Sequence, residues 1–370
     1  MSADDSPAVE IRVAAPADGP ALIGAIESID RETEYLGMAG ERLAWADQPT
    51  AALEAWTRSG DGVYVIATAR DAIVGYVGAL AGHYRSTRGV LSIPHIGIRG
   101  ANRRQGIATR LLGALESWAR ARGAHRIDLS VDEDNAPARA LYDACGYQPE
   151  GRVREAVRDG GRWHSYIPMA KRLDDGSRAM APIVVERRRR PDSVTVNFRP
   201  LVAGDADALR SWELALLAAP PRSLKAIDEV ATPERFREDL RAMVAGTETY
   251  LVAAVTDVAG AERVVGLSAA SAKPGVRLRH DVTMIVNVLV DYRSLGIGRR
   301  LCAIAEDWAR ARGAHRLSTA VHAANDAGLR FAAAMGFVQE AVMRGYARFG
   351  DVHVDLVTLA KLLPETATET

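Results

Sequence analysis

The chain contains one nine-residue sequence twice, and this repetition limits the possible folds more than any other feature. Residues 118–126 read WARARGAHR, and residues 308–316 read WARARGAHR again, 190 positions later. Further identical residues recur at the same offset. They are Arg103 and Arg293, Gly106 and Gly296, Asn135 and Asn325, Gly146 and Gly336, and Lys171 and Lys361. The agreement predicts a duplicated domain, so each copy can be compared with the other.

Size and composition fit two globular domains. A chain of 370 residues can build two cores of ordinary size, and 48% hydrophobic with 25% charged residues is typical of folded protein. The formal net charge is zero, which gives no general attraction to nucleic acid or to anionic lipid. We therefore expect neither a nucleic-acid nor a membrane partner.

Cysteine usage and the N-terminal sequence predict a cytoplasmic protein. Cys145 and Cys302 occupy non-equivalent positions in the two copies, which argues against a disulfide framework. The first residues, MSADDSPAVEIR, have no basic start and no apolar segment typical of a signal peptide. No uncharged apolar run is long enough to cross a bilayer, and no HExxH pattern or cysteine cluster indicates a metal site.

We expect a first domain over residues 1–173, a linker over 174–192 and a second domain over 193–370. The linker contains Gly, Pro and the basic run Arg187–Arg190. That run could contact a nucleic acid or an acidic partner. A solvated linker is the favoured interpretation, because no aromatic residues accompany the charges.

Each copy has the order of elements of an α/β domain. The expected strands are 9–13, 63–69, 73–79, 93–98 and 126–131 in the first copy and 194–199, 249–255, 264–270, 283–290 and 316–321 in the second. A long amphipathic helix follows the fourth strand, and a second helix ends at Gly146 or Gly336. Gly123 and Gly313 are expected to end the long helices. This alternation predicts an α/β fold with mixed strand pairing.

A glycine-containing turn precedes each long helix and fits the pattern R-x-x-G-x-[GA]. Its residues are Arg103, Arg104, Gln105, Gly106, Ile107, Ala108 and Thr109 in the first copy, and Arg293, Ser294, Leu295, Gly296, Ile297, Gly298 and Arg299 in the second. Backbone N–H groups and the helix dipole at such a turn can bind a pyrophosphate. Glycine allows close approach, and arginine adds charge and directional donors.

A second motif, N-x-x-A-x-x-L-Y-x-x-x-G-[FY], spans residues 135–147. With the glycine turn, it resembles the GCN5-related N-acetyltransferase (GNAT) superfamily, over both copies. The resemblance implies two tandem domains, each with a mixed, splayed central sheet flanked by helices. It also implies acetyl-CoA as co-substrate, bound where the sheet splays.

The resemblance assigns roles to particular residues. Pantetheine would pair with the backbone of Ile96, Gly97 and Ile98, and correspondingly of Val286, Asn287 and Val288 in the second copy. The pyrophosphate would lie on the amides of 104–109, and the Ile98 amide would stabilise the oxyanion. Asn135, like Asn325, would contact the pantetheine arm. Tyr142 would lie near the acetyl sulfur and protonate the thiolate, although it could also be a core aromatic.

The base that deprotonates the amine is less clear from the sequence. His95 on the coenzyme strand is a candidate, because histidine titrates near neutral pH. Glu133, Glu34 and a water chain are alternatives. His125 and His315 follow a helix-ending glycine and are interpreted as turn residues.

The second copy departs from the first at the expected acid. Ala332 stands where the first copy has Tyr142, and Phe331 stands in place of Leu141. Gly328 replaces Ala138. We therefore expect a catalytic first domain and a second domain that binds acetyl-CoA but is structural, regulatory or changed in chemistry. The alternative is that both domains are catalytic with different acceptors.

The acceptor side is the least defined part of the sequence. Six residues after the first strand could face a cationic amine or form a solvated helix face. They are Glu27, Asp30, Glu32, Glu34, Tyr35 and Glu41. We expect an N-acetyltransferase for a primary amine of a small molecule, an amino-acid derivative or a peptide. The alternative is an acyl-CoA-binding regulatory protein. A monomer with an internal pseudo-dimer and a homodimer both remain open.

Overall fold

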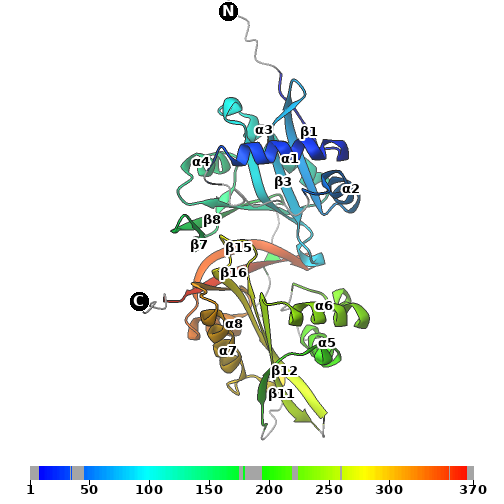
Figure 1. Ribbon diagram of the computed structural model, residues 1–370, viewed down its shortest axis with the longest axis vertical. Coiled ribbons are helices and arrows are strands. Elements are labelled where there is room, and N and C mark those ends of the chain that lie inside the picture. Colours follow the sequence, from blue (N-terminus) through cyan, green and yellow to red (C-terminus); the bar gives the residue numbers. More distant parts are fainter. Residues whose placement is uncertain are drawn as a thin grey trace, which may run out of the picture. The chain divides into compact units, whose positions relative to one another are not determined.

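The computed structural model forms two compact units (Figure 1). It describes residues 8–33, 35, 46–174, 178–179, 194–218, 224–258, 261–349 and 351–364. Unit 1 comprises Met1–Arg154, His164–Arg178 and Gly345–His353, and unit 2 comprises Glu155–Trp163, Ala179–Arg344 and Val354–Thr370. The units therefore differ from the simple division 1–173 and 193–370 at two segments. Residues 155–163 belong to unit 2, and residues 345–353 belong to unit 1.

The first sheet runs in the order β1-β2-β3-β4-β5-β8-β6, with β7 paired to β8. Its strands are β1 (Glu10–Val13), β2 (Gly62–Ala69), β3 (Ala72–Ala81), β4 (Val90–Ile98), β5 (Arg126–Asp132), β6 (Gln148–Pro149), β7 (Val153–Asp159) and β8 (Arg162–Arg172). Its helices are α1 (Gly19–Asp30), α2 (Pro49–Ser59), α3 (Ile107–Ala121) and α4 (Ala136–Ala144). Among the strand pairings described for this sheet, only that of β4 with β5 is parallel, so the sheet is mixed, as predicted.

The second sheet repeats this order as β10-β11-β12-β13-β14-β16-β15, with β9 paired to β16. Its strands are β9 (Arg178–Ala179), β10 (Asn197–Pro200), β11 (Thr249–Val258), β12 (Ala261–Ala272), β13 (Asp281–Val288), β14 (Arg316–His322), β15 (Val338–Phe349) and β16 (Val352–Leu362). Its helices are α5 (Ala206–Leu217), α6 (Pro233–Ala245), α7 (Ile297–Ala311) and α8 (Asp326–Ala334). The parallel step recurs between β13 and β14.

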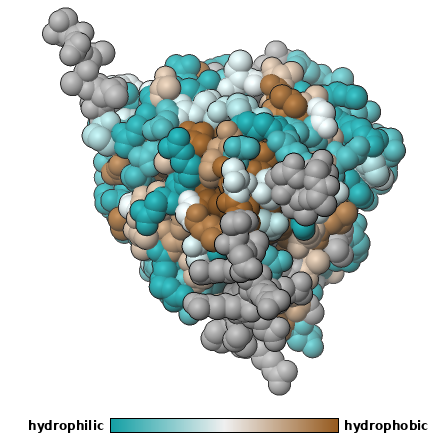
Figure 2. Space-filling model, turned by 90° about the horizontal axis from the view of Figure 1, so that it is seen from below, coloured by the Kyte–Doolittle hydropathy of each residue, from teal (hydrophilic) through white to brown (hydrophobic). Residues whose placement is uncertain are grey.

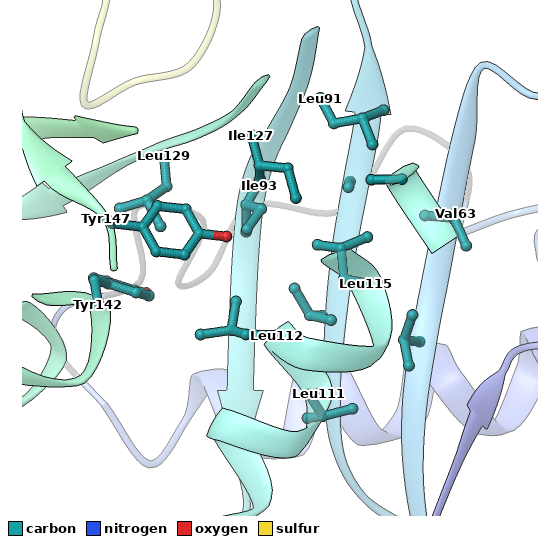
Figure 3. Packing of buried hydrophobic residues seen from close by; sticks show 14 of the residues in the cluster. Val63, Leu91, Ile93, Leu111, Leu112, Leu115, Ile127, Leu129, Tyr142 and Tyr147 are labelled. Atoms are coloured by element: carbon teal, nitrogen blue, oxygen red, sulfur yellow. The ribbon is translucent and has the colours of Figure 1, made fainter. Parts of the chain in front are cut away.

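Two apolar layers cover the faces of the first sheet. One layer joins the sheet to α3 and α4, and Leu111, Leu115 and Ile127 are at its centre (Figure 3). The other lies under α1 and α2 and includes Leu22, Ile29 and the rings of Tyr64 and Tyr76. Unit 2 divides its buried residues between two clusters in a similar way. Burial of this apolar surface is the main stabilising contribution to each unit.

Helix α3 has the amphipathic spacing that the sequence predicts. Leu111, Leu112 and Leu115 are buried against the sheet. The helix ends where Gly123 adopts φ 71°, and Gly313 ends α7 with φ 72°. These left-handed glycines confirm the predicted ends of the two long helices, since other residues adopt this conformation only with strain.

Both sheets splay after the parallel step. In unit 1, β4 pairs with β5 only over Val90–Ile93, opposite Arg126–Leu129. In unit 2, the parallel ladder joins Asp281–Thr283 to Arg316–Ser318 and stops there. The rest of β4 pairs with β3 on its other side, and the rest of β13 pairs with β12. The second edge of each strand therefore has backbone groups that an extended ligand can pair with, as the predicted splayed sheet requires.

Strands β4 and β13 differ in their pairing by one residue. The β3–β4 ladder shifts register between Gly78 and Leu80, because three steps on β4 oppose two on β3. Leu91 and Ile93 therefore pack against α3, whereas after the shift His95 points to the opposite face, beside Tyr64. The β12–β13 ladder keeps one register throughout. A bulge of this kind redirects side chains and leaves part of the backbone unpaired, and unit 1 alone has it at this place.

The face seen in Figure 2 is mainly hydrophilic, with apolar residues gathered toward the middle of the view. Large exposed apolar residues are commoner in unit 2 than in unit 1. They are Val202, Met243, Val244, Val276, Ile285, Leu295 and Val338 in unit 2, and Val13 and Leu80 in unit 1. Ile285, on the coenzyme strand of unit 2, is 54% exposed. No helix in the described ranges is long and apolar enough to cross a membrane.

Candidate functional site

Each long helix begins at a glycine turn with the same unusual backbone. Gly106 has φ 72° and Arg104 has φ 64°, and in unit 2 Gly296 has φ 80° and Ser294 has φ 63°. No side chain caps α3 or α7. A Cβ on Gly106 or Gly296 would meet no atom within 4 Å. The first-turn N–H groups therefore lack a capping side chain and border open space, which suits an anion.

The signature arginines connect the glycine turn to the strand before it. Arg103 Nε donates to the carbonyl of Ile98 at 3.1 Å, and Arg293 Nε donates to Val288 at 3.0 Å. Each guanidinium thus links the glycine turn to the end of the coenzyme strand. Arg104 is exposed at the surface of the turn, so it is the better candidate for a direct charge contact with phosphate.

The two motif asparagines cap the following helices. Asn135 Oδ1 accepts from the Ala138 amide at 3.2 Å at the start of α4, and Asn325 Oδ1 accepts from Gly328 at 3.1 Å. Their amide oxygens thus satisfy helix donors. Each asparagine also stands at the splayed end of β5 or β14, where the sequence places the pantetheine arm.

Tyr142 is part of the apolar layer between α4 and the sheet, in the same cluster as Leu112 and Leu129 (Figure 3). It is 7% exposed, and its ring lies 6.0 Å from that of Tyr147 in an edge-on arrangement. Burial raises the pKa of the Tyr142 phenol above its ordinary value, so the hydroxyl keeps its proton. Tyr142 is therefore both a core aromatic and a phenol able to donate a proton. Its counterpart Ala332 is equally buried.

His95 lies on the opposite face of the sheet, under α1 and α2. Its Nε2 is 2.5 Å from the hydroxyl of Tyr64, and Tyr76 packs edge-on against it. The side chain is 8% exposed, and burial lowers the pKa of His95 to about 4. The imidazole is therefore neutral at neutral pH, but it is a weak base that is already hydrogen-bonded. The strand registers show that Leu251, Leu267 and Ile285 of unit 2 correspond to Tyr64, Tyr76 and His95 in that order.

The other candidate bases are less suitable. Glu133 accepts three hydrogen bonds from Arg152, between 2.7 and 2.9 Å, and this pairing lowers the pKa of the Glu133 carboxyl. A carboxylate held in this way accepts a further proton poorly. Glu34 lies outside the residues that the structure describes.

The acids expected on the acceptor side have several different surroundings. Asp30 accepts from the Tyr76 hydroxyl at 3.4 Å, and burial raises the pKa of the Asp30 carboxyl. Glu32 accepts from the Gly100 amide at 2.5 Å and from Arg103 at 3.4 Å, which ties α1 to the glycine turn. Glu27 is exposed 4.0 Å from Arg31. Tyr35 is described, whereas Glu41 is beyond the described part of this region.

Sequence reasoning missed an Asp–His pair at the end of β5. His164 Nδ1 lies 2.9 Å from Asp132 Oδ2. The other carboxylate oxygen accepts from the backbone amide of Asp134 at 2.8 Å. The repeat offers a signal for this pair, because His322 and Val354 stand at the two positions in unit 2.

Much of the identity between the copies is structural. In WARARGAHR, Arg122 lies over the Trp118 ring at 4.0 Å, as Arg312 does over Trp308 at 4.9 Å. Arg126 is fully buried, and it pairs with Glu150 at 2.5 Å and Asp128 at 3.0 Å. A strongly repeated motif therefore does not by itself mark reacting groups.

The repeated histidines are more than turn residues, which corrects the sequence interpretation. In unit 1, His125 is buried and its Nε2 lies 3.0 Å from the carbonyl of Gly345. In unit 2, His315 pairs with Glu155 and stacks on Trp163, with ring centroids 4.1 Å apart. Each histidine thus holds the hairpin end assigned to its unit.

No group of three or more potential metal ligands occurs within the described ranges. The model for the Acetyltransferase (GNAT) family matches the chain twice, over residues 26–147 and 213–337. The two matches together span more than half of the chain and correspond to the two copies.

Three solved structures illustrate the similarity. An acetyltransferase of the GNAT family from Streptococcus pneumoniae is 23% identical, with 45% of this chain and 100% of that chain covered and a TM-score of 0.43. A ribosomal-protein-alanine N-acetyltransferase from Brucella melitensis is 25% identical, with coverages of 44% and 99% and a TM-score of 0.40. A putative acetyltransferase from Salmonella typhimurium, solved with its cofactor acetyl-CoA, is 21% identical, with coverages of 46% and 97% and a TM-score of 0.42.

Proposed function

Because the chain belongs to the acetyltransferase (GNAT) family, we propose that unit 1 transfers an acetyl group from acetyl-CoA to a primary amine. The acceptor class is a small molecule, an amino-acid derivative or a peptide. The observation that carries the proposal is the combination of an uncapped glycine turn, a splayed coenzyme strand and a buried phenol in one unit.

The proposed coenzyme site extends from the glycine turn to the splay. The diphosphate binds the amides of 104–109, where the helix dipole is positive and glycine leaves space. Pantetheine pairs with the open edge of Ile96–Ile98, as an added strand would. The Salmonella protein's acetyl-CoA supports this choice of donor. Arg103 contributes by fixing the turn to the strand, rather than by touching phosphate.

The proposed chemistry needs a neutral amine, an oxyanion donor and a proton for the leaving sulfur. The amide of Ile98, at the end of the bulged strand, is the proposed oxyanion donor. The Tyr142 hydroxyl protonates the departing thiolate, and its raised pKa means that the phenol still carries its proton before the transfer. Low dielectric around this buried group strengthens such a contact.

Thiol release tests the proposal directly. The full chain is mixed with acetyl-CoA and a panel of primary amines, and free CoA is measured while calorimetry records coenzyme binding. We expect turnover with at least one amine class. If folded, coenzyme-bound protein releases no thiol with any member of the panel, the transferase proposal is wrong for this chain.

A second function concerns unit 2, which we propose binds acyl-CoA without transferring the acyl group. Its turn at Gly296 matches that of unit 1, and α7 also lacks a capping side chain. Its coenzyme strand has no bulge, and Ala332 replaces the phenol. Such a unit suits a regulatory role. Calorimetry with the Gly106→Val chain tests it, because one CoA site should remain.

A further inference from the structure

The Asp132–His164 pair lies at the splayed end of the unit 1 sheet, on the face opposite α3. β4 and β5 are parallel, so Ile98 and Asp132 end at the same edge. On β5, Ile127, Leu129 and Val131 pack toward α3, which places Asp132 on the opposite face. His95 reaches that face too, after the bulge. The pair therefore borders the splay from the β5 side, and His95 borders it from the β4 side.

The hydrogen bonds of the pair fix both side chains. Asp132 is 5% exposed and receives the Asp134 amide on one oxygen and His164 on the other. A carboxylate that accepts from Nδ1 keeps that nitrogen protonated and leaves the Nε2 lone pair pointing outward. The His164 side chain is 20% exposed, so the imidazole is partly accessible to solvent.

The two alternative bases are each engaged by another side chain. His95 is closed off by Tyr64 and has a pKa lowered to about 4. Glu133 is neutralised by Arg152. Unit 2, which also lacks the phenol, has no equivalent pair, because Val354 stands where unit 1 has His164. The pair and the phenol thus occur together in one unit and are absent together from the other.

We propose that His164, oriented by Asp132, is the general base that removes a proton from the acceptor ammonium. This proposal rests on the function proposed above for unit 1. His164 Nε2 takes one proton, the amine nitrogen attacks the thioester carbon, the C–N bond forms and the C–S bond breaks. The ammonium loses two protons in total. One leaves through His164 to solvent, and the other replaces the proton that Tyr142 gives to the sulfur.

Other ionisable groups around His164 will contribute to any pH dependence. Asp132 is on β5, and Glu133 and Asp134 follow it in the turn. Arg152 pairs with Glu133 just before β7, and Tyr166 lies opposite Asp132 on β8. Variants must therefore be compared across pH rather than at one value.

The test compares His164→Gln and Asp132→Asn with His83→Gln in the full chain. His83 is an exposed histidine beyond the other end of β4, so its variant controls for the substitution. Thiol release is measured from pH 6 to 10, and CoA affinity is measured by calorimetry. For His164→Gln we expect kcat/KM at neutral pH to fall by about 100-fold or more, with CoA affinity unchanged. The defect should shrink at high pH, where the amine loses its proton unaided.

Asp132→Asn should show a smaller defect with the same pH trend, because the imidazole remains but its orientation is lost. If the loss of kcat/KM in His164→Gln is constant across pH, or is below about threefold, His164 is not the general base. The function proposed for unit 1 would then still stand. Absence of thiol release by the unaltered chain with every amine would overturn the proposed function and this assignment with it. A merely structural pair would change stability but not the shape of the pH profile.

Discussion

At the residue scale, the two phenols in the core of unit 1 have the same chemistry but different expected importance. Tyr142 and Tyr147 are both buried and lie edge-on. Unit 2 keeps an aromatic ring at the second position, as Phe337, and loses the first to Ala332. Unit 2 thus tolerates a ring without a hydroxyl at the position of Tyr147. Tyr147→Phe is therefore a matched control for Tyr142→Phe.

We predict that Tyr142→Phe lowers kcat by about 10- to 1000-fold, the range in which general acid catalysis contributes. Tyr147→Phe should leave kcat within about threefold. Coenzyme affinity should change little in both variants, since neither hydroxyl is placed at the diphosphate. Steady-state thiol release and calorimetry measure these effects. Unchanged turnover in Tyr142→Phe would contradict the role of this residue as acid.

Buried histidines predict a loss of stability in acid. Burial lowers the pKa of His95 from 6.5 to about 4. It is also the main cause that lowers the pKa of His125 from 6.5 to about 4. Between these values the unfolded chain binds more protons than the folded chain, so stability is complete above about pH 6.5 and falls as pH drops toward 4. Each group contributes up to ~3 kcal/mol. Thermal unfolding at pH 7 and 4.5 should show a smaller difference for His95→Gln than for the unaltered chain; an equal difference would refute the assignment.

At the scale of elements, the sequence predicts the helices and glycine turns well, because their signals are local. The ends at Gly123 and Gly313 follow from residues next to one another in the chain. The bulge in β4 is different. It exists only as a register between β4 and β3, so a strand read by itself contains no sign of it. The Asp132–His164 pair is hidden for the same reason, because the β5–β8 ladder brings together residues 32 positions apart.

The glycine turn can be tested separately from backbone strain. Gly106 and Gly123 have nearly the same φ, 72° and 71°, and a Cβ on either meets no atom within 4 Å. Valine should therefore cost similar stability at both positions. We predict that only Gly106→Val weakens CoA binding, by at least about tenfold, or ~1.4 kcal/mol. The CoA affinities are measured by calorimetry with only the unit 1 site available. Equal affinities in the two variants would place the diphosphate elsewhere.

Buried charge networks fasten strands in both units, but with exchanged residues. Arg126 pairs with Asp128 on β5, whereas Arg316 pairs with Asp281 on β13. Each arginine also binds a glutamate, Glu150 or Glu340. The position of the acid has changed strand while the buried arrangement persists, which neither copy reveals by itself.

Removing Arg126 should be costly, because two buried carboxylates then lack their partner. We predict that Arg126→Met destabilises unit 1 by about 3–5 kcal/mol. Arg58→Met, which breaks an exposed pair with Glu54, should cost less than about 1 kcal/mol. Urea unfolding followed by hydrogen exchange in β5 distinguishes the two. Comparable losses in the two variants would contradict the buried network.

At the scale of the whole molecule, the repeat predicts two domains, but not which unit each hairpin end joins. Residues 155–163 lie within the first copy in sequence yet belong to unit 2, and residues 345–353 lie within the second copy yet belong to unit 1. The WARARGAHR histidines make the relevant contacts. Sequence identity between the copies predicts that both have the same fold. It does not predict which unit each hairpin end joins, because that depends on contacts between residues far apart in the chain.

Trp163 provides a test of this assignment. Its ring stacks on His315 and meets His280 edge-on, with centroids 4.1 and 4.6 Å apart. Trp163→Ala should reduce hydrogen-exchange protection in β14 of unit 2, by up to ~3 kcal/mol, and leave β2 and β3 of unit 1 unaffected. Loss of protection confined to unit 1 would contradict the assignment of this hairpin end to unit 2.

The most direct test of the whole account is a crystal structure of the full chain with CoA at saturating concentration. We expect a diphosphate on the backbone amides after Gly106, pantetheine along Ile96–Ile98 and the sulfur beside Tyr142. Coenzyme bound elsewhere, with both glycine turns empty, would contradict the proposed coenzyme sites.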